Sequence, residues 1–381
     1  MKIIYVVGGL IYKTGTFATV HFENLKSAWD KEGLKVEGLF GALAAGEKKP
    51  RDVNFLLEKP VPKEDIRVLR YWQLLRYRNY CKSLQTYWKK KGKEYNLVIE
   101  RWWPLGGTFS FLARKNRVPV IVFLPPSVIK NKLVDWLSNV RLKKLAQLVQ
   151  AFVVNDLCSK ELLLKWKIKR ENIYFLPPPC NLNTFKPFSQ ELVRKELSLP
   201  PDKKILLYGG GLNYFHQLMP MVKAFCKVNP KDTLLIIIGE GDKKKDILSI
   251  FKKSKVNNYL FKSTLSQSDY SKYISACDLG LAPYNNKLKK ISALKIGEYM
   301  AMERAVVTTR SAGEELISDG ENGFLLTANN LEEWEKFFLT LPSRKYLLEM
   351  GKGNKLKVAN FNTTEVANKF INIIKNLLNC S

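Results

Sequence analysis

The sequence predicts an α/β protein built from two Rossmann-like, doubly wound domains, and three observations support this prediction. Short runs rich in Val, Ile, Leu and Tyr alternate with longer amphipathic stretches along the whole chain. Most of these runs are apolar on both faces, as in parallel sheets covered by helices. A proline-rich connector at 177–190 divides the series in two, and the length of 381 residues suits two domains.

The strand-like runs form two series. The first lies at 2–7, 97–100, 119–123, 151–154 and 173–176, and the second at 204–208, 233–239, 259–261, 279–282, 305–308 and 323–326. Helical spacing of apolar residues follows or precedes them at 22–32, 190–197, 218–228 and 269–276. We therefore expect domains at 1–185 and 186–362. The segment 363–381 should form a helix whose single apolar face packs back on the first domain.

Charge is the unusual feature of the composition. The chain holds 63 Lys and Arg against 35 Asp and Glu, a net charge of +28, and residues 1–185 carry 33 of the basic and 15 of the acidic side chains. Such a field attracts phosphorylated substrates, anionic lipid or nucleic acid, although a general bias toward lysine explains part of it. The apolar fraction of 46% excludes a disordered chain.

Cysteine and histidine usage excludes several classes of protein. The six Cys are scattered without a Cys-x-x-Cys pair, which suits a reducing compartment. Two His exclude a three-His metal site, and no Asp-x-Asp or carboxylate cluster is present, so we expect no essential metal. The apolar start at 1–9 is too short for a signal peptide and is interpreted as a strand. We expect a cytoplasmic protein.

Glycines follow two strands of the second series. Gly209, Gly210 and Gly211 come directly after one strand, and Gly239 and Gly241 follow the next. Glycine at the carboxyl end of a parallel strand lets a ligand approach the backbone closely, although a tight turn without a ligand explains it as well. Neither cluster is G-x-G-x-x-G, so a dinucleotide site is not supported.

A helix expected to begin near Ser292 carries the sharper signal. Its first amides, at Ser292, Ala293 and Leu294, should point at the interdomain cleft and favour a phosphate or diphosphate. Lys295 adds a full charge in the first turn, and Glu298 one turn later can accept hydrogen bonds from a ribose diol. The alternative is an ordinary surface pair of Lys295 and Glu298 at i,i+3.

The motifs around this helix resemble a known family. Residues 293–301 (ALKIGEYMA) and 315–323 (ELISDGENG) are similar to the second domain of the retaining nucleotide-sugar glycosyltransferases of GT-B architecture, in the family-four group also called glycosyl transferases group 1. Weaker similarities extend over residues 8–10, 95–101, 112–120 and 177–187. The resemblance implies a nucleoside diphosphate-sugar in the second domain, an acceptor in the first and a cleft between them.

The implied activity is transfer of a sugar, with retention, to a glycan or lipid-linked acceptor, as in polysaccharide biosynthesis, with no cofactor. The resemblance assigns catalysis to Glu298 and Lys295. It assigns donor binding to Gly209, Gly210, Gly211, His216, Gly239, Gly241, Lys290, Ser292, Ala293 and Leu294, and an acceptor-side loop to Gly8, Gly9, Lys13 and Thr16.

Three departures from the family pattern leave a second function open. Lys290 stands where the pattern has the first Glu of a Glu-x7-Glu pair, and Gly211 and His216 stand where it has Arg and Lys. No His lies near 125–127, where the pattern often has one. The alternative is a catalytically weakened homologue that binds sugar nucleotides or polyanions.

Two basic segments rich in Tyr and Trp lie in the first domain, at 67–92 and at 130–149, the latter with Trp136. Three interpretations apply to them. The aromatic side chains pack on the sheet beneath a solvated basic face, or they contact an anionic membrane surface, or they bind single-stranded nucleic acid. We expect no nucleic-acid partner and keep the first two interpretations.

Overall fold

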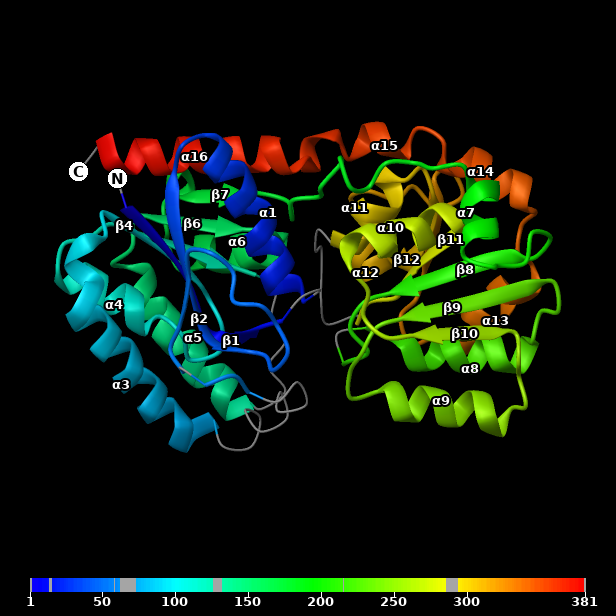
Figure 1. Cartoon of the computed structure of the whole chain (residues 1–381), viewed down its shortest axis with the longest axis horizontal. Helices are drawn as coiled ribbons and strands as arrows, with labels where there is room; N and C mark the ends of the chain where they lie inside the picture. Colours follow the sequence, from blue (N-terminus) through cyan, green and yellow to red (C-terminus); the bar gives the residue numbers. More distant parts are fainter. Residues whose placement is uncertain are drawn as a thin grey trace. The chain divides into compact units, whose positions relative to one another are not determined.

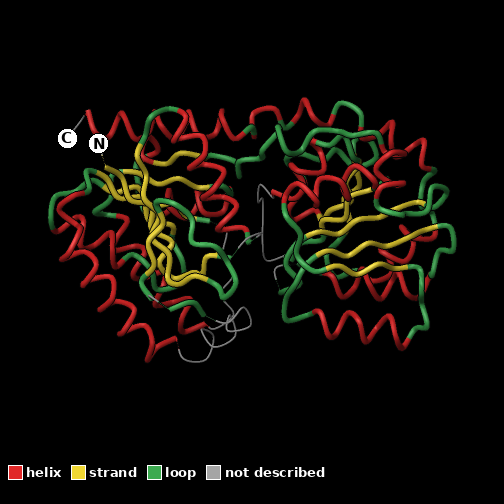
Figure 2. The backbone as a smooth tube through the Cα atoms, in the orientation of Figure 1, coloured by secondary structure: helices red, strands yellow, loops and turns green. Residues whose placement is uncertain are grey.

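The computed structural model describes residues 2–13, 16–57, 59–61, 73–125, 132–214, 216–285 and 294–379. The chain divides into two compact units, Met1–Pro177 with Thr364–Ser381, and Pro178–Thr363. Each unit contains one parallel sheet with helices on both faces (Figures 1 and 2). The predicted fold class of two doubly wound α/β domains is confirmed. The boundary between the units falls eight residues before position 185.

In the first unit the strands run in the order β3-β2-β1-β4-β5-β6-β7, and every described pair is parallel. Strand order reverses between β1 and β4, and a reversal of this kind is where doubly wound sheets bind ligands at the carboxyl ends of their strands. The strands are β1 (Lys2–Tyr12), β2 (Lys35–Leu43), β3 (Val53–Phe55), β4 (Leu97–Arg101), β5 (Val120–Leu124), β6 (Ala151–Val154) and β7 (Ile173–Phe175).

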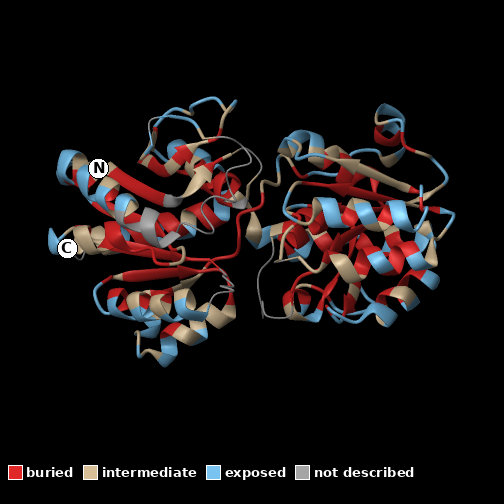
Figure 3. Cartoon of the chain, turned by 90° about the horizontal axis from the view of Figure 1, so that it is seen from below, coloured by how far each residue is buried: buried red, intermediate tan, exposed pale blue. Residues whose placement is uncertain are grey.

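Alternate residues of β1 enter two different cores. Ile3 and Tyr5 pack with α1 and α16, whereas Ile4 and Val6 pack with α3, α4, α5 and α6. The sheet is therefore buried on both faces, as the colouring of Figure 3 shows. The helices are α1 (Phe17–Lys31), α3 (Gln73–Lys91), α4 (Thr108–Lys115), α5 (Lys132–Ala146), α6 (Leu157–Lys165) and α16 (Thr363–Asn379).

The sequence prediction missed β2 and β3. Strand β2 is interrupted by Glu37, Gly38 and Gly41, which weaken its strand pattern. Gly38 is required by packing, because a Cβ there would lie 2.7 Å from Cζ of Phe22. Strand β3 has three residues at the edge of the sheet, too few for a periodic signal.

The prediction of a glycine loop directly after a short first strand is wrong. Strand β1 continues to Tyr12, so Gly8 and Gly9 lie within it. The pairing register with β2 shifts between Val7 and Ile11, which places both glycines at an irregularity of the strand.

The second unit repeats the same topology, with strands in the order β10-β9-β8-β11-β12-β13 and the reversal between β8 and β11. One face of its sheet packs on α8, α9, α13 and α14. The strands are β8 (Lys204–Gly209), β9 (Thr233–Ile238), β10 (Tyr259–Lys262), β11 (Leu279–Ala282), β12 (Ala305–Thr309) and β13 (Gly323–Leu326). The helices are α7 (Gln190–Glu196), α8 (Leu218–Val228), α9 (Lys244–Lys253), α10 (Gln267–Ala276), α11 (Leu294–Ala301), α12 (Arg310–Gly313), α13 (Leu331–Leu339), α14 (Arg344–Gly351) and α15 (Asn354–Lys357).

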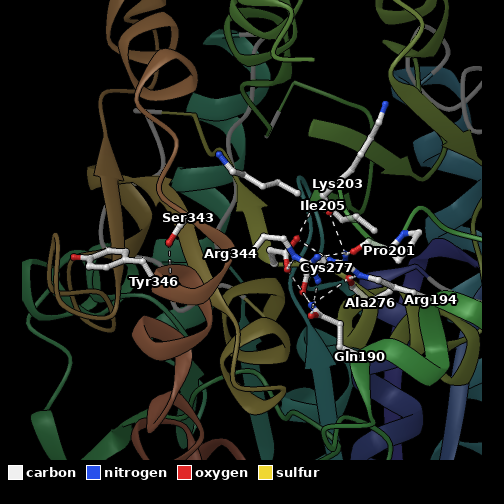
Figure 4. Close-up of polar contacts among 12 residues, drawn as sticks. Gln190, Arg194, Pro201, Lys203, Ile205, Ala276, Cys277, Ser343, Arg344 and Tyr346 are labelled. Carbon is white, nitrogen blue, oxygen red and sulfur yellow. Dashed lines mark hydrogen bonds and ion pairs between the residues drawn. The ribbon is translucent and has the colours of Figure 1, made fainter. Parts of the chain in front are cut away.

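A buried carboxylate ties the amino-terminal ends of β8 and β11 to α7 and α14. Asp278, fully buried, accepts hydrogen bonds from Arg194 Nη2 at 2.7 Å, the Ile205 amide at 2.7 Å and Arg344 Nε at 3.3 Å. Gln190 Nε2 donates a further bond to it at 3.1 Å. Figure 4 shows Gln190 and Arg194 from α7 converging with Arg344 from α14. The carboxylate is thus satisfied from every side.

No helix in the described ranges is both long and apolar enough to cross a bilayer.

Replacing Asp278 by Ala should destabilise the protein by about 3–5 kcal/mol, because Arg194 would remain buried without its partner. Urea unfolding followed by circular dichroism measures the change. Asp246→Ala is the matched control, because its i,i+3 pair with Lys243 is exposed and should contribute less than about 1 kcal/mol. Equal losses in the two variants would show that the Asp278 network does not hold the unit together.

Candidate functional site

The glycines at the ends of β8 and β9 bring two loops together. Gly210 donates its amide to the Ile238 carbonyl at 2.9 Å, and a Cβ on Gly239 would lie 1.9 Å from the Gly210 carbonyl oxygen. Both glycines have positive φ, 141° and 149°. Gly239 is therefore used for packing one loop against the other, which leaves less room for its predicted contact with a ligand.

The remaining predicted glycines differ in their neighbours. A Cβ on Gly209 would collide with the Tyr270 ring, and one on Gly241 with the Leu212 carbonyl oxygen. At Gly210, in contrast, the atom nearest a Cβ would be Lys295 Nζ, at 2.8 Å. The structure thus brings Gly210 together with Lys295, whereas Gly209, Gly239 and Gly241 are occupied by packing within the unit.

Lys295 is buried without a hydrogen bond. It lies in the first turn of α11, is 7% exposed, and its Nζ makes no hydrogen bond to any described residue. The ammonium lies 3.9 Å from the centroid of the Tyr208 ring and 5.5 Å from that of Tyr284, which gives it cation–π stabilisation. Burial lowers the pKa of Lys295 to about 7, while the charge of Glu298 opposes that shift.

Glu298 lies one turn further along α11 and is 8% exposed. Burial raises its pKa to about 8, and the charge of Lys295 opposes the shift. No hydrogen bond joins the two side chains within the described structure, and neither is on the surface. The alternative of an ordinary surface pair is therefore wrong, because both groups are held away from water at the end of the sheet.

His216 completes an aromatic cluster with Tyr208 and Tyr284 around Lys295. Its ring centroid lies 4.9 Å from that of Tyr284 and 5.9 Å from that of Tyr208. Its Nδ1 is buried and has no hydrogen-bond partner within the described ranges. Burial, and then the charge of Lys295, hold the pKa of His216 well below its usual value, so the ring is neutral at pH 7. It can accept or donate one hydrogen bond there but adds no charge.

Tyr208 links the cluster to the glycine loop. Its hydroxyl donates to the Gly211 carbonyl at 2.8 Å while its ring lies under the ammonium of Lys295. The sequence analysis did not select Tyr208 or Tyr284. Tyr208 lies at the carboxyl end of β8 and Tyr284 just beyond that of β11, the two strands between which the sheet order reverses. Their position after these strands was the sequence signal that could have identified them.

Several predicted donor residues cannot be placed. Lys290, Ser292 and Ala293 lie outside the described residues, and α11 begins at Leu294. The second segment that resembles the family, 315–323, is described, and its polar side chains hold the turn itself. Asp319 Oδ1 accepts from the Leu325 amide at 2.9 Å, and Asn322 Oδ1 accepts from the Ser318 amide at 2.7 Å.

The predicted acceptor-side residues of the first unit form the entry to α1. Thr16 is the residue before α1, and its Oγ1 lies 2.9 Å from that of Thr19. The Lys13 amide donates to the same Thr19 oxygen at 3.3 Å. Lys13 and Thr16 are thus brought together, on the chain that leaves the carboxyl end of β1.

A polar group missed by the sequence analysis lies at the carboxyl ends of β4 to β6. Arg101 and His21 both contact the Phe123 ring, at 5.0 Å and 4.6 Å. Burial and the charge of Arg101 lower the pKa of His21 well below its usual value. Asn155 is 1% exposed, and neither of its amide atoms has a hydrogen-bond partner in the part of the chain that is described. Buried polar groups of this kind require a ligand or water.

Comparisons with known proteins agree with the architecture. Residues 203–342 match the family model described as Glycosyl transferases group 1. No curated protein gives a significant match.

Among solved structures, a sucrose-phosphate synthase from Thermosynechococcus elongatus is 16% identical with a TM-score of 0.79, and all of both chains is covered. Anabaena HepE in complex with UDP-glucose is 15% identical with a TM-score of 0.76 over 99% of this chain and 100% of that one. WaaG, a glycosyltransferase involved in lipopolysaccharide biosynthesis, is 16% identical with a TM-score of 0.72, over 98% and 99% of the chains.

The chain therefore has the GT-B fold, and the resemblance to GT-B glycosyltransferases is confirmed. The family match and the neighbours together support a glycosyltransferase. Among the described residues, no group of three or more His, Cys, Asp or Glu side chains is placed to hold a metal ion.

Tyr208→Leu should weaken the binding of inorganic pyrophosphate by about tenfold, because loss of roughly 1–2 kcal/mol of cation–π energy releases the Lys295 ammonium from its position. Tyr208→Phe keeps the ring and loses only the bond to Gly211, so it should bind nearly as well as the wild type. Isothermal titration calorimetry measures both affinities. Equal affinity in Tyr208→Leu and Tyr208→Phe would show that the ring does not position Lys295.

Lys295→Met should stabilise the folded protein by roughly 3 kcal/mol at pH 7, because the unfolded chain binds a proton there that the buried amine holds only in part. The gain should shrink as the pH rises toward about 10, where lysine loses its proton in the unfolded state also. Urea unfolding at several pH values tests this, with exposed Lys245→Met as the control. A destabilised Lys295→Met variant would indicate a purely structural role for Lys295.

Proposed function

We propose that the protein is a retaining glycosyltransferase, which moves a sugar from a nucleoside diphosphate-sugar to a glycan or lipid-linked acceptor. The observation that supports this most directly is the Lys295 ammonium, buried beside Gly210 at the carboxyl end of β8 with no hydrogen-bond acceptor among the described residues. A diphosphate supplies the negative charge that this position lacks. The HepE structures hold UDP and UDP-glucose, which favours a uridine nucleotide as the first donor to test.

The proposed donor position follows from the charges in the second unit. The diphosphate lies on Gly210, Gly211 and the first amides of α11, with Lys295 as its cation. Its arrival restores the proton on Lys295, since a neighbouring anion favours the charged amine. Glu298 accepts hydrogen bonds from the ribose hydroxyls. Lys290 is proposed to add charge at the same diphosphate.

The proposed reaction is a displacement at the anomeric carbon. The acceptor oxygen forms a bond to that carbon as its bond to the diphosphate oxygen breaks, and the electron pair leaves with the phosphate. The departing phosphate takes the proton of the acceptor hydroxyl, on the same face, so the configuration is retained and no protein base is needed. The contribution of Lys295 is to stabilise the charge that develops on the leaving group.

A second candidate function is favoured by the state of His216. Because His216 is neutral and Gly211 carries no side chain, Lys295 is the single cation placed in the described part of this site. A protein with this deficit binds a sugar nucleotide without turning it over. Binding of UDP that depends on Lys295, together with the absence of transfer or hydrolysis for a panel of labelled nucleotide sugars, would establish this alternative.

Polysaccharide biosynthesis and peripheral association with a membrane complete the proposal. A lipid-linked acceptor lies at a bilayer surface, and the positive charge of the first unit suits such a surface.

Lys295→Met should lower the turnover of UDP-glucose by about 10²–10³, the usual loss for one oriented group that stabilises a leaving charge. Glu298→Gln should mainly raise KM, because it changes a contact to a part of the donor that does not react. Radiolabelled product release measures both, with Lys245→Met as a folded control. Wild-type turnover in Lys295→Met would refute the assignment of Lys295, and an unchanged KM in Glu298→Gln would refute that of Glu298.

A further inference from the structure

Exposed apolar side chains gather on one face of α5 in the first unit. Leu133, Trp136 and Val140 are 59%, 61% and 38% exposed. Their spacing of three and four residues places them on the same side of the helix. With the flanking Lys132 and Lys143 they define what we call the α5 face. Large exposed apolar groups clustered in this way indicate a contact surface.

The opposite side of α5 fixes the helix to the unit. Leu142 and Leu145 are buried in the core beneath the sheet. Arg141 donates from Nε to the Gly106 carbonyl at 2.6 Å and from Nη2 to Thr108 Oγ1 at 2.9 Å. The α5 face is therefore presented by an anchored helix, and its exposure does not come from a frayed segment.

A shallow groove runs along the α5 face. It has a volume of about 330 Å³, and its lining residues are Lys132, Asp135, Trp136, Asn139, Val140, Lys143 and Trp166. Two indoles and an aliphatic side chain thus line a depression together with two lysines and one carboxylate. Indole rings and lysine side chains are the residues that settle at the boundary between lipid headgroups and acyl chains.

The charge around the α5 face is strongly positive. Residues 132–170 contain nine basic and three acidic side chains. The basic side chains at the helix ends are exposed, among them Lys144 at the end of α5 and Lys165 and Lys167 at the end of α6. A partner of negative charge gains from all of them.

We propose that the α5 face binds the surface of an anionic bilayer. The inference deepens the proposed function and rests on it for its meaning, because it names the surface from which a lipid-linked acceptor would be reached. A second copy of the chain is disfavoured, since two faces of the same positive sign repel. Nucleic acid would stack on Trp136 but gains little from Leu133 and Val140, whereas acyl chains bury all three.

Helix α3, which carries the other basic aromatic segment, differs from α5. Its described aromatic side chains Tyr87 and Trp88 pack into the core, and Leu84 is fully buried. The exposed positions of its second half, such as Lys89 and Lys90, are polar. The interpretation of aromatic packing beneath a solvated basic face thus holds for the described part of α3. The described side chains of this helix offer charge to a membrane but no exposed apolar group to insert.

Flotation of the full chain with vesicles tests the proposal. The wild type should bind vesicles containing phosphatidylglycerol and not pure phosphatidylcholine. Lys143→Glu/Lys144→Glu should weaken binding by about tenfold or more, since each basic group at the surface contributes. Lys89→Glu/Lys90→Glu, with the same change of charge at the end of α3, should weaken it far less.

A second pair of variants tests the apolar part. Leu133→Ser/Trp136→Ser should also lower binding by about tenfold, because buried apolar area scales with affinity. Leu339→Ser on α13 removes an equally exposed side chain, 71% exposed, and should change nothing. Circular dichroism confirms that each variant is folded, and hydrolysis of UDP-glucose without vesicles should be unchanged in all of them.

Equal losses for the α3 and α5 charge variants would overturn the proposal, as would undiminished binding after the serine substitutions. Trp136-dependent binding of oligothymidine with no binding to vesicles would replace it by a nucleic-acid site. If the wild type turns over its donor but does not bind vesicles, the α5 face proposal fails and the proposed enzyme stands. Vesicle binding without turnover of any donor leaves the α5 face intact and refutes the proposed enzyme.

Discussion

A buried ammonium that lacks a hydrogen-bond acceptor among the described residues is the constraint on which the site of the second unit depends. A lone charge in such a place is costly, and the shifted pKa of Lys295 is the measure of that cost. The Tyr208 and Tyr284 rings reduce the cost without removing it. The protein thus keeps a position that an incoming anion improves, and preorganisation of this kind is what electrostatic catalysis requires.

Two buried charges at opposite ends of the same sheet have opposite surroundings. At the amino-terminal ends of the strands, Asp278 is surrounded by donors from Arg194, Arg344, Gln190 and the Ile205 amide. At the carboxyl ends, the Lys295 ammonium has no hydrogen-bond acceptor among the described residues. The first arrangement holds the helices on the sheet and leaves nothing for a ligand to satisfy. The second lowers stability and leaves a position that an anion would stabilise, as in the usual compromise between stability and activity.

The sequence predicted the fold better than the site. Each predicted strand is present, and most are apolar runs buried on both faces, although β7 and β10 are only partly buried. Strand β2 was not predicted, because Gly38 makes room for the ring of Phe22 through a long-range contact. Motif spacing selected Lys295 and Glu298 but not their burial. In the cluster of Tyr208, His216 and Tyr284, only Tyr284 is far from the other two in sequence, and the three-dimensional structure brings it to them.

The departures from the family pattern at Gly211 and His216 and the burial of Lys295 are best understood as one feature. A cation at position 216 would act on Lys295, whose charge already acts on the His216 ring, and like charges in a buried site would lower the pKa of Lys295 still further. Instead His216 is neutral and packs its ring against Tyr284, next to the ammonium. Without further cations nearby, the pKa of Lys295 is not lowered further and its ammonium keeps its charge more readily. The sequence differences that suggested a weakened enzyme are therefore also what a site with a single buried lysine requires.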